Sequence, residues 1–479
     1  MKKQHLDKII SLCKRKGFVF PNSEIYGGLK ASYDYGPLGV ELKKSISELW
    51  WKEMTQSHQN IVGLDSAIMV HPDVWEASGH IANFNDPMTD NKDNKKRYRI
   101  DDLLSQQKSK VIDALCSELK IDSTKSDDIY NDMAHALLSN GSKYDGVLEQ
   151  AGVIDPCSGS IGKWTPAVQF NLMFKTDSGP SEKTGKNIYL RPETAQGIFI
   201  NYLLVQHTMR LKVPFGIAQI GKAFRNEIIA RNFIFRTREF EQMEMQYFVH
   251  PSEDVDNMDL WKQKRLDFYL NHLGIKSKNL KFHQHSKDAL AHYAKDAYDI
   301  EYNFPFGWGE VEGIHNRTDF DLKQHENLSG KNMTYFDTKT QEKYHPYIIE
   351  TSTGLNRLFL MVLCEAYFED TDNNRVVLRL PYDLAPIKAV ICPLVKKDGL
   401  PEKAMSVFET LNKEFPCIYD EQGSIGKRYY RQDEAGTPFG ITLDHQTLED
   451  ESVTIRERDS MKQTRVSIDK ISAFIHDNK

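Results

Sequence analysis

Charged side chains are concentrated in one part of the chain that otherwise has the pattern of buried strands and helices. The stretches RPETAQGIF at 191–199 and RNEIIARNFIFRTREFEQME at 225–244 contain at least four arginines and five carboxylates. Burying a charge costs free energy unless the charge binds a ligand or an opposite charge. These residues are therefore the first candidates for a ligand site.

The second stretch has the pattern of two extended strands, at 215–228 and 233–247, joined by a short loop. Side chains two residues apart share one face of a strand, so Arg225 and Glu227 lie together on the first strand. We expect the opposite face of the second strand, with Met243 and its odd-numbered neighbours, to pack in the core. The face that carries function would then present Arg236, Arg238, Phe240, Gln242, Glu244 and Gln246.

The side chains on this face suit a nucleotide and an amine. Arginines bind phosphate oxygens, Phe240 offers a flat surface for a base, and Glu244 could hold an ammonium group. A salt-bridged surface hairpin explains the same pattern, and this segment alone does not separate the two interpretations.

A third segment, YIIETSTGLNRLFLMVLCEAYF at 347–368, adds a strand and a helix with charged residues at their junction. Glu350 and Ser352 share one strand face, and the helix that follows Thr353 is apolar almost all round, which predicts burial. Arg357 falls in its first turn, where a cation opposes the helix dipole. A phosphate or carboxylate ligand would explain this arginine, and an ion pair with Glu350 is the alternative.

These three segments, together with YDYGPLGVELKKSISELWWKEM at 33–54, resemble the class II aminoacyl-tRNA synthetases. The segment at 33–54 looks like their motif 1, FRNE at 224–227 with FRTREFEQME at 235–244 looks like motif 2, and ETSTGLNR at 350–357 looks like motif 3. GGLKASYDYGPLGVELK, RPETAQGIF and WGEVEGIHNRTDFDL at 308–322 resemble the homodimeric glycyl-tRNA synthetases in particular.

The resemblance extends over nearly the whole chain and implies both a fold and a reaction. The fold would be an α+β catalytic domain built on an antiparallel sheet, with a polar insertion and a C-terminal α/β anticodon-binding domain. The reaction would be the ATP-dependent attachment of glycine to tRNA(Gly) through glycyl-adenylate, with release of AMP and pyrophosphate. It implies ATP with Mg²⁺, glycine, tRNA(Gly) and a second copy of the chain as partners.

The same resemblance assigns the ATP site. Arg225 would bind the α-phosphate, and Arg357 the γ-phosphate or one face of the adenine, with Phe240 on the other face. These two arginines are the catalytic candidates. Glu227 would contact the adenine amino group or position the arginines, and Glu310 is the candidate for contact with magnesium. The ATP-binding candidates are Arg225, Asn226, Glu227, Phe235, Arg236, Arg238, Phe240, Glu310, Val311, Gly354 and Arg357.

For glycine, the resemblance implies a ring of acids around the ammonium group, with Ser352 where an α-substituent would have to go. Arg317 would organise the acids. Every competing amino acid is larger than glycine, so a steric wall can reject them without an editing domain. The glycine-binding candidates are Arg99, Glu193, Phe240, Glu244, Arg317, Glu350 and Ser352.

Two positions depart from the family pattern. Gln246 stands where relatives commonly have a second acid, and Thr351 replaces the proline that is usual in motif 3. Neither change removes a group that the chemistry requires. The segment GIAQIGKA at 216–223 nearly matches a phosphate loop, but we expect it to lie within a strand and regard the match as coincidence.

The composition is compatible with this interpretation but does not decide it. The chain has 479 residues, of which 40% are hydrophobic and 27% charged, which is typical of a soluble protein of two or three domains. The net charge of −6 gives no general sign of nucleic-acid binding. No apolar run approaches the roughly 20 residues that span a membrane. Six scattered cysteines are typical of reduced thiols, and we expect a cytoplasmic protein.

We expect residues 1–84 and 160–380 to form the catalytic domain, 85–159 the insertion and 384–479 the anticodon-binding domain. Helices are predicted near 101–119 and 127–139 within the insertion. Relatives often carry cysteine pairs there that hold a zinc. Of these pairs only Cys157 remains, and the stretch from Asp90 to Lys96 contains no cysteine, so we predict no structural metal site. In the C-terminal part, strands at 387–394, 416–420, 438–443 and 452–457 alternate with helices at 401–414, 424–435 and 468–476.

Several alternatives stay open. The apolar stripe in 33–54 is more often core than interface, and only the motif 1 resemblance favours a dimer contact. The protein could be a same-class enzyme for another amino acid, or a non-catalytic relative that binds nucleic acid. Such a relative need not keep Arg225 and Arg357. The candidates for anticodon contacts are Arg428, Arg431, Arg456 and Arg458, and solvated surface charge is the other interpretation of any one of them.

Overall fold

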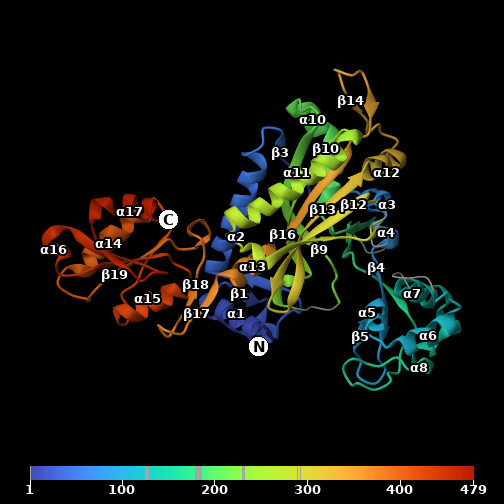
Figure 1. The fold of residues 1–479 in the computed structure, drawn as a ribbon, viewed down its shortest axis with the longest axis horizontal. Coiled ribbons are helices and arrows are strands. Elements are labelled where there is room, and N and C mark those ends of the chain that lie inside the picture. Colours follow the sequence, from blue (N-terminus) through green and yellow to red (C-terminus); the bar gives the residue numbers. More distant parts are fainter. Residues whose placement is uncertain (1, 124–128, 179–185, 229–231, 288–289, 292) are drawn as a thin grey trace.

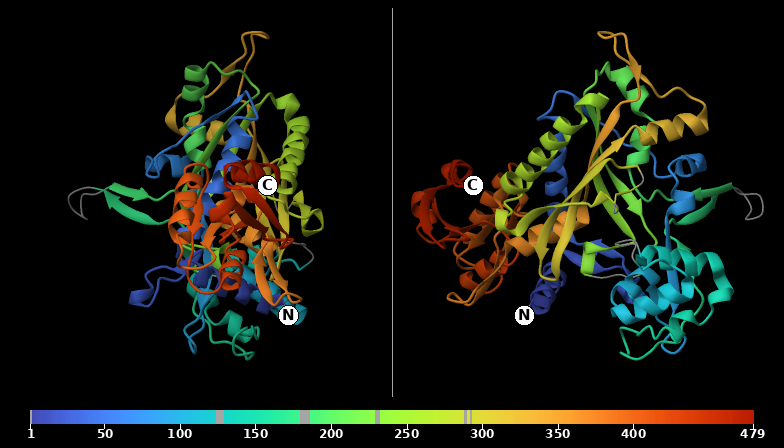
Figure 2. Two further views of the ribbon diagram at one scale, coloured as in Figure 1. Left: turned by 90° about the vertical axis from the view of Figure 1, so that its left-hand side faces the viewer. Right: turned by 45° about the vertical axis from the view of Figure 1, so that its right-hand side comes forward.

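The computed structural model describes residues 2–123, 129–178, 186–228, 232–287, 290–291 and 293–479 (Figure 1). A central body carries the insertion at one end and the C-terminal domain at the other. The right-hand view of Figure 2 also shows the body between them, and the left-hand view has the C-terminal domain in front of the body. No helix of the described chain has the length and apolar character needed to cross a membrane.

The body is built on one seven-stranded sheet with the order β11-β12-β13-β16-β10-β9-β3. All neighbours are antiparallel except β3 and β9, which confirms the predicted antiparallel sheet. The strands are β3 (Ile61–Gly63), β9 (Phe215–Phe224), β10 (Glu239–Val249), β11 (Leu280–Gln284), β12 (Asp296–Phe304), β13 (Gly307–Thr318) and β16 (Tyr347–Gly354).

The main hydrophobic core lies between this sheet and the helices α1 (Lys2–Lys16), α2 (Pro37–Thr55), α11 (Asp254–Asp267) and α13 (Leu355–Ala366). In α2, Leu42, Ile46, Trp50 and Met54 are fully buried within the same chain. The apolar stripe of 33–54 is therefore core. The predicted burial of the helix after motif 3 is also confirmed, because ten residues of α13 are buried.

The two strands of the charged hairpin are shorter than predicted. β9 ends at Phe224 and β10 begins at Glu239, so Arg225, Glu227, Arg236 and Arg238 belong to the connection; residues 229–231 of it lie outside the described residues. The backbone finds other partners here, because Arg225 N–H donates to the Arg238 carbonyl and the next N–H donates to the carbonyl of Leu172. A 3₁₀ turn at Phe233–Phe235 then precedes β10. The segment at 216–223 lies inside β9, as predicted.

The insertion has its own small core. β4 (Asn85–Asp90), β5 (Arg97–Arg99) and β6 (Val168–Asn171) form a three-stranded sheet, and Trp164 packs with the buried residues of the helices. The helices are α5 (Ile100–Ser105), α6 (Ser109–Leu119), α7 (Ile129–Asn140) and α8 (Val147–Gln150). The predicted helix at 101–119 is thus two helices, and the second predicted helix is confirmed from residue 129, since 127 and 128 are outside the described residues.

The C-terminal domain has the predicted α/β alternation. Its sheet has the order β20-β19-β21-β22-β23, parallel around β19 and antiparallel beyond β21. The last strand was not predicted. The elements are β19 (Ala389–Pro393), α14 (Leu400–Leu411), β20 (Cys417–Tyr419), α15 (Ile425–Asp433), β21 (Phe439–Leu443), α16 (Thr447–Asp450), β22 (Ser452–Glu457), β23 (Gln463–Ser467) and α17 (Ile471–Asp477).

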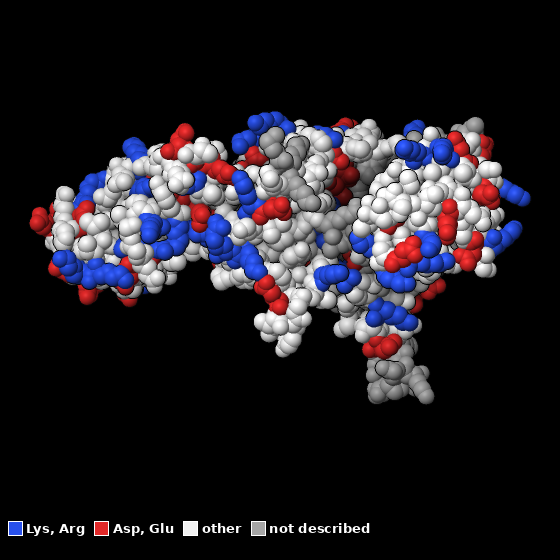
Figure 3. All heavy atoms as spheres, turned by 90° about the horizontal axis from the view of Figure 1, so that it is seen from below, with Lys and Arg blue, Asp and Glu red and all other residues white. Residues whose placement is uncertain are grey.

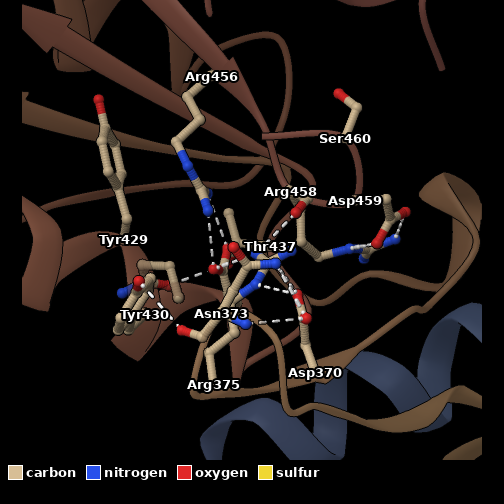
Figure 4. A network of polar contacts seen from close by, with 12 residues as sticks. Asp370, Asn373, Arg375, Tyr429, Tyr430, Thr437, Arg456, Arg458, Asp459 and Ser460 are labelled. Carbon is tan, nitrogen blue, oxygen red and sulfur yellow. Dashed lines mark hydrogen bonds and ion pairs between the residues drawn. The ribbon is translucent and has the colours of Figure 1, made fainter. Parts of the chain in front are cut away.

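A buried ionic network joins this domain to the hairpin of β17 (Tyr367–Asp370) and β18 (Arg375–Leu378), as Figure 4 shows. Arg375 Nε donates to Asp370 at 2.7 Å, and its Nη1 donates to Asp433 at 2.6 Å. Asp433 also accepts from Arg456 Nη1 at 2.9 Å. Each buried charge in this network has an opposite charge within hydrogen-bonding distance.

The four arginines proposed as anticodon contacts are therefore engaged in structure. Arg428 is buried and donates to the carbonyls of Gly423 and Pro393. Arg456 and Arg458 are buried, and Arg458 donates to the carbonyl of Gly436. Arg431 is more exposed and pairs with Asp420 at 2.6 Å.

On the face seen in Figure 3, lysines and arginines are spread over both end modules and mixed with acids. This mixture agrees with the small net charge. The six cysteines are unpaired, five are buried, and Cys157 in the insertion is exposed. The described residues contain no group of His, Cys, Asp and Glu arranged to hold a metal ion.

Candidate active site

A cavity of about 230 Å³ opens on the sheet face opposite the main core, over β10, β13 and β16. It is lined by most of the predicted site residues, although they come from sequence positions up to 164 residues apart (357 − 193). The predicted residues at its wall are Glu193, Arg225, Glu227, Phe235, Arg236, Phe240, Glu244, Glu310, Arg317, Glu350, Ser352, Gly354 and Arg357.

One end of the cavity is acidic. Glu193, Glu244 and Glu350 all line it, so the three acids converge on one small pocket. Glu244 on β10 lies directly opposite Ser352 on β16, and the Ser352 hydroxyl donates to Glu244 Oε1 at 2.8 Å. The other oxygen of Glu244 is buried and has no hydrogen-bond partner within the described part of the chain.

The acids are not electrically equivalent. Burial, together with the charges of Glu350 and Glu193, raises the pKa of Glu244 to about 8. Burial would also raise the pKa of Glu193, but the neighbouring His80 imidazole and the Arg317 guanidinium outweigh it and hold that pKa well below its usual range. At neutral pH, Glu193 is ionised and Glu244 is close to its titration point.

Arg317 holds the acidic end together. Its Nη1 donates to Glu350 at 2.7 Å, while its Nε and Nη2 donate to Asp321 at 2.8 and 3.0 Å. The guanidinium also lies 4.0 Å from the centre of the Tyr293 ring, which lines the cavity. Three N–H groups of this arginine thus hold the carboxylates of Glu350 and Asp321 in place.

The other end of the cavity carries the arginines. The Arg225 guanidinium lies 5.4 Å from the centre of the Phe240 ring, and its Nε donates to the carbonyl of Pro192. Arg357, in the first turn of α13, pairs with Glu310 at 3.1 Å, and its guanidinium lies 4.6 Å from the Phe235 ring. The Arg357 charge lowers the pKa of Glu310.

Arg191, one of the two charged residues of RPETAQGIF, has a structural role and does not line the cavity. It is buried, and it donates from Nε to the Lys222 carbonyl and from Nη1 to the Ser66 carbonyl. Gly221 makes room for it, since a Cβ at that position would lie 2.1 Å from Arg191 Nη2. Arg191 therefore anchors the turn that carries Glu193.

Four predicted residues lie outside the cavity wall. Arg99 pairs with Asp86 at 3.2 Å and lines a neighbouring cavity of about 280 Å³, which shares Glu227, Phe235 and Arg236 with the first. Its assignment to glycine stays a prediction. The others are Val311, which is buried in the core, Asn226, whose backbone N–H donates to Leu172, and Arg238, which donates to the Glu227 carbonyl.

Gln246, the departure from the family pattern, is fully buried next to the acids along β10. Neither polar atom of its amide has a partner among the described residues. The other departure, Thr351, is buried on the core side of β16. Neither residue lines the cavity.

Sequence reasoning missed several residues that contact the acids. His80 Nε2 lies 3.4 Å from Glu193, and His315 Nδ1 lies 3.8 Å from Glu350. Tyr293 and Gln196 were also not considered. Gln196 carried a usable signal, since it is a polar residue in an apolar helix, three positions after Glu193.

The sequence comparisons agree with this geometry. Residues 174–367 match the family model described as the tRNA synthetase class II core domain (G, H, P, S and T), and residues 388–478 match an anticodon binding domain. The fold and the site therefore have the organisation of a class II aminoacyl-tRNA synthetase.

Three curated relatives show to which family within this class the chain is similar. The glycine–tRNA ligase of Chlorobaculum tepidum is 49% identical over 98% of this chain and 99% of its own length. The glycine–tRNA ligase of Treponema denticola is 50% identical over 96% of this chain and 94% of its own length. That of Macrococcus caseolyticus is 48% identical over 99% of this chain and 99% of its own length. The chain belongs to the glycine–tRNA ligase family.

Proposed function

We propose that this protein attaches glycine to tRNA(Gly) in two steps, with glycyl-adenylate as the intermediate. The observation that carries the proposal is the convergence of Glu193, Glu244 and Glu350 in the same cavity as Arg225 and Arg357. The acids suit a small ammonium group, and the arginines suit a triphosphate. A non-catalytic nucleic-acid-binding protein would have no use for either set.

In the first step, the glycine carboxylate attacks the α-phosphate of ATP and pyrophosphate leaves. Arg225 stabilises the charge that develops on the α-phosphate, and Arg357 holds the distal phosphates or the adenine. Catalysis of this kind is mostly positioning and electrostatic stabilisation. In the second step, a terminal ribose hydroxyl of the tRNA attacks the adenylate and AMP is released.

The donor groups in the cavity fit magnesium bound together with ATP. Mg²⁺ is usually held by one or two carboxylates and by the phosphates of the substrate. Glu310 faces the cavity beside Arg357 and supplies one such carboxylate. When bound, the ion would neutralise phosphate charge.

Glycine is recognised through its charges and its size. The ammonium group suits the unpartnered oxygen of Glu244, and its positive charge favours the ionised form of that acid. Glu193 and Glu350 complete the negative environment. The Ser352–Glu244 hydrogen bond holds the hydroxyl where a larger amino acid would place its side chain, so the site excludes alanine and serine sterically.

The partners follow from the two matched domains. We propose that residues 388–478 contact the anticodon part of the tRNA and that two copies associate near 33–54. The loop before that segment exposes Ile25, Tyr26 and Leu29 at 88%, 87% and 54%, which supports an apolar contact there. We place the protein in the cytoplasm, where tRNA is charged.

Glycine-dependent exchange of pyrophosphate into ATP tests the proposal. We expect exchange with glycine and at most trace exchange with alanine or serine. Exchange that required another amino acid would mean a same-class enzyme of different specificity. Binding of tRNA without exchange for any amino acid would favour the non-catalytic alternative.

A further inference from the structure

Gln196 lies behind the acidic end of the cavity, in α9 (Ala195–Phe199), and is fully buried. Its side-chain amide Nε2 donates to Glu193 Oε1 and to Asp321 Oδ1, each at 3.0 Å. Its Oε1 is 2.8 Å from His325 Nε2. One neutral amide therefore bridges two carboxylates that belong to different elements of the fold.

The chemistry of these neighbours fixes which way the amide points. Ionised carboxylates only accept hydrogen bonds, so the NH₂ group must face Glu193 and Asp321. The amide oxygen then faces His325, whose Nε2 must carry a proton. Burial lowers the pKa of His325, which favours the neutral ring, and the contact with the amide oxygen selects the tautomer that carries the proton on Nε2.

The bridge connects both sides of the acidic pocket. On one side it holds Glu193, whose other oxygen faces His80. On the other side it holds Asp321, which binds Arg317 through two hydrogen bonds, and Arg317 in turn binds Glu350. Gln196 thus connects two acids that line the cavity, Glu193 directly and Glu350 through Asp321 and Arg317.

We infer that Gln196 is a positioning residue for glycine, which sets Glu193 and the Asp321–Arg317–Glu350 group in the geometry that the ammonium requires. This inference rests on the proposed role of those acids in glycine binding. A glutamine is suited to the task because it donates twice without adding charge. Asparagine would be too short, and an apolar residue would donate nothing.

Gln196→Met tests the inference with a side chain of similar size and no donors. Hydrogen bonds to charged groups are stronger than neutral ones, so we expect the KM for glycine to rise roughly 10- to 100-fold. The KM for ATP should change less than about twofold, because the arginine end of the cavity has no contact with Gln196. The measurement is pyrophosphate exchange with each substrate varied in turn, together with the melting temperature.

Gln219→Met is the matched control. Gln219 is also fully buried, but among the described residues its amide bonds only to the backbone, at Ser66 N–H and the Thr194 carbonyl. If loss of a buried glutamine acts only through stability, the two variants should shift the melting temperature and the glycine KM alike. We expect only Gln196→Met to separate the glycine KM from the ATP KM.

Gln196→Glu gives a pH signature that a merely structural role would not produce. The new carboxyl group would face Glu193 and Asp321, with His325 on its far side and the Arg317 guanidinium and the His80 ring one residue further away. The two acids raise its pKa, and only its protonated form can donate. Relative to wild type, kcat/KM for glycine should recover as the pH falls from about 8 to about 6.

Two results would overturn the inference. One is equal rises in the KM for glycine and for ATP in Gln196→Met. The other is a glycine KM that is unchanged in Gln196→Met but raised in Glu193→Gln. In that case the proposed glycine site would stand, and only the role of Gln196 would fail. If Glu193→Gln also leaves the glycine KM unchanged, the assignment of the acids fails, and the role of Gln196 fails with it.

Discussion

Two regions of this protein bury charge, and they do so in opposite ways. At the junction of the C-terminal domain, Arg375 and Arg456 meet Asp433 and Asp370, and each charge is matched. The Arg375 guanidinium holds the pKa of Asp370 below its usual range. This region is complete without a ligand.

In the cavity, three glutamates lie together, and of these only Glu350 accepts a hydrogen bond from an arginine, Arg317, within the described part of the chain. One oxygen of Glu244 has no partner within the described residues, and the pKa of Glu244 is raised to about 8. Unmatched buried charge costs stability, and it is kept where a ligand supplies the missing charge. Both regions bury several charges. The ionic network of the C-terminal domain pairs each charge with an opposite one, whereas the cavity does not, and this difference distinguishes the structural region from the functional one.

We expect the largest loss of folding stability when one charged side chain of the ionic network at the junction is replaced. Arg375→Met leaves Asp370 and Asp433 short of a buried cation, and breaking a buried pair typically costs about 3–5 kcal/mol. Chemical denaturation followed by fluorescence measures the loss. If the comparison is correct, pyrophosphate exchange by the remaining folded protein should keep its KM for glycine.

In the cavity, the largest expected effect is on catalysis. Arg225→Ala removes the cation proposed for the α-phosphate, and loss of one such group typically lowers the rate by about 10²- to 10³-fold or more. Pyrophosphate exchange should nearly disappear, while tRNA binding measured by filter retention stays largely intact. Equal losses of exchange and tRNA binding would show that the arginine has been assigned wrongly.

Glu244→Gln should have the opposite outcome to Arg375→Met: it should weaken glycine binding without lowering stability. The change removes one charge for the ammonium group, and we expect the KM for glycine to rise roughly 10- to 100-fold. It also removes like-charge repulsion from Glu350 and Glu193, so the free protein should be as stable as wild type or more stable. A variant that lost both stability and glycine binding would contradict the contrast between the two regions.

The raised pKa of Glu244 also predicts a pH dependence. A carboxyl group whose pKa is higher in the folded than in the unfolded state favours folding at low pH, and this contribution is lost as the pH rises through its folded value of about 8. The free energy of unfolding of wild type should therefore decline between about pH 5 and pH 8.5 relative to Glu244→Gln.

Saturating glycine should reduce this decline, because the ammonium group stabilises the ionised acid. Glycine binding near pH 7 should also release a proton, which calorimetry in buffers of different ionisation enthalpy would detect. Binding without proton release would place the ammonium group away from Glu244.

The smallest effect is expected for an exposed pair in the C-terminal domain. Arg431 is 42% exposed and pairs with Asp420, and exposed pairs usually contribute at most about 1 kcal/mol. Arg431→Gln should therefore change stability by less than that. A much larger loss would mean that exposure does not distinguish the structural arginines of this domain.

The sequence predicted the antiparallel sheet, the α/β pattern of the C-terminal domain and most of the residues that line the cavity. The periodicity of β10 separated Met243 and Met245 in the core from Phe240 and Glu244 at the cavity, since alternation is a local property of a strand. The apolar composition of α13 predicted its burial in the same way. The resemblance then supplied the roles proposed for individual residues.

The structure corrected what depends on partners far away in the sequence. The strands of the charged hairpin end early because the backbone beyond Phe224 bonds to Leu172 and Arg238 instead of continuing the ladder. The stripe of α2 is core because the sheet and α13 cover it. The arginines at 428, 456 and 458 are buried because acids or carbonyls from other elements meet them.

Local patterns therefore determined which residues form strands, helices and faces, because those depend on neighbours in the chain. Only the tertiary structure decided which charges are balanced and which are not, because a carboxylate and its cation can come from any two elements. Arg317 and Arg375 are both buried arginines near acids in the sequence. The structure alone distinguishes the one that completes a network from the one that leaves a pocket short of positive charge.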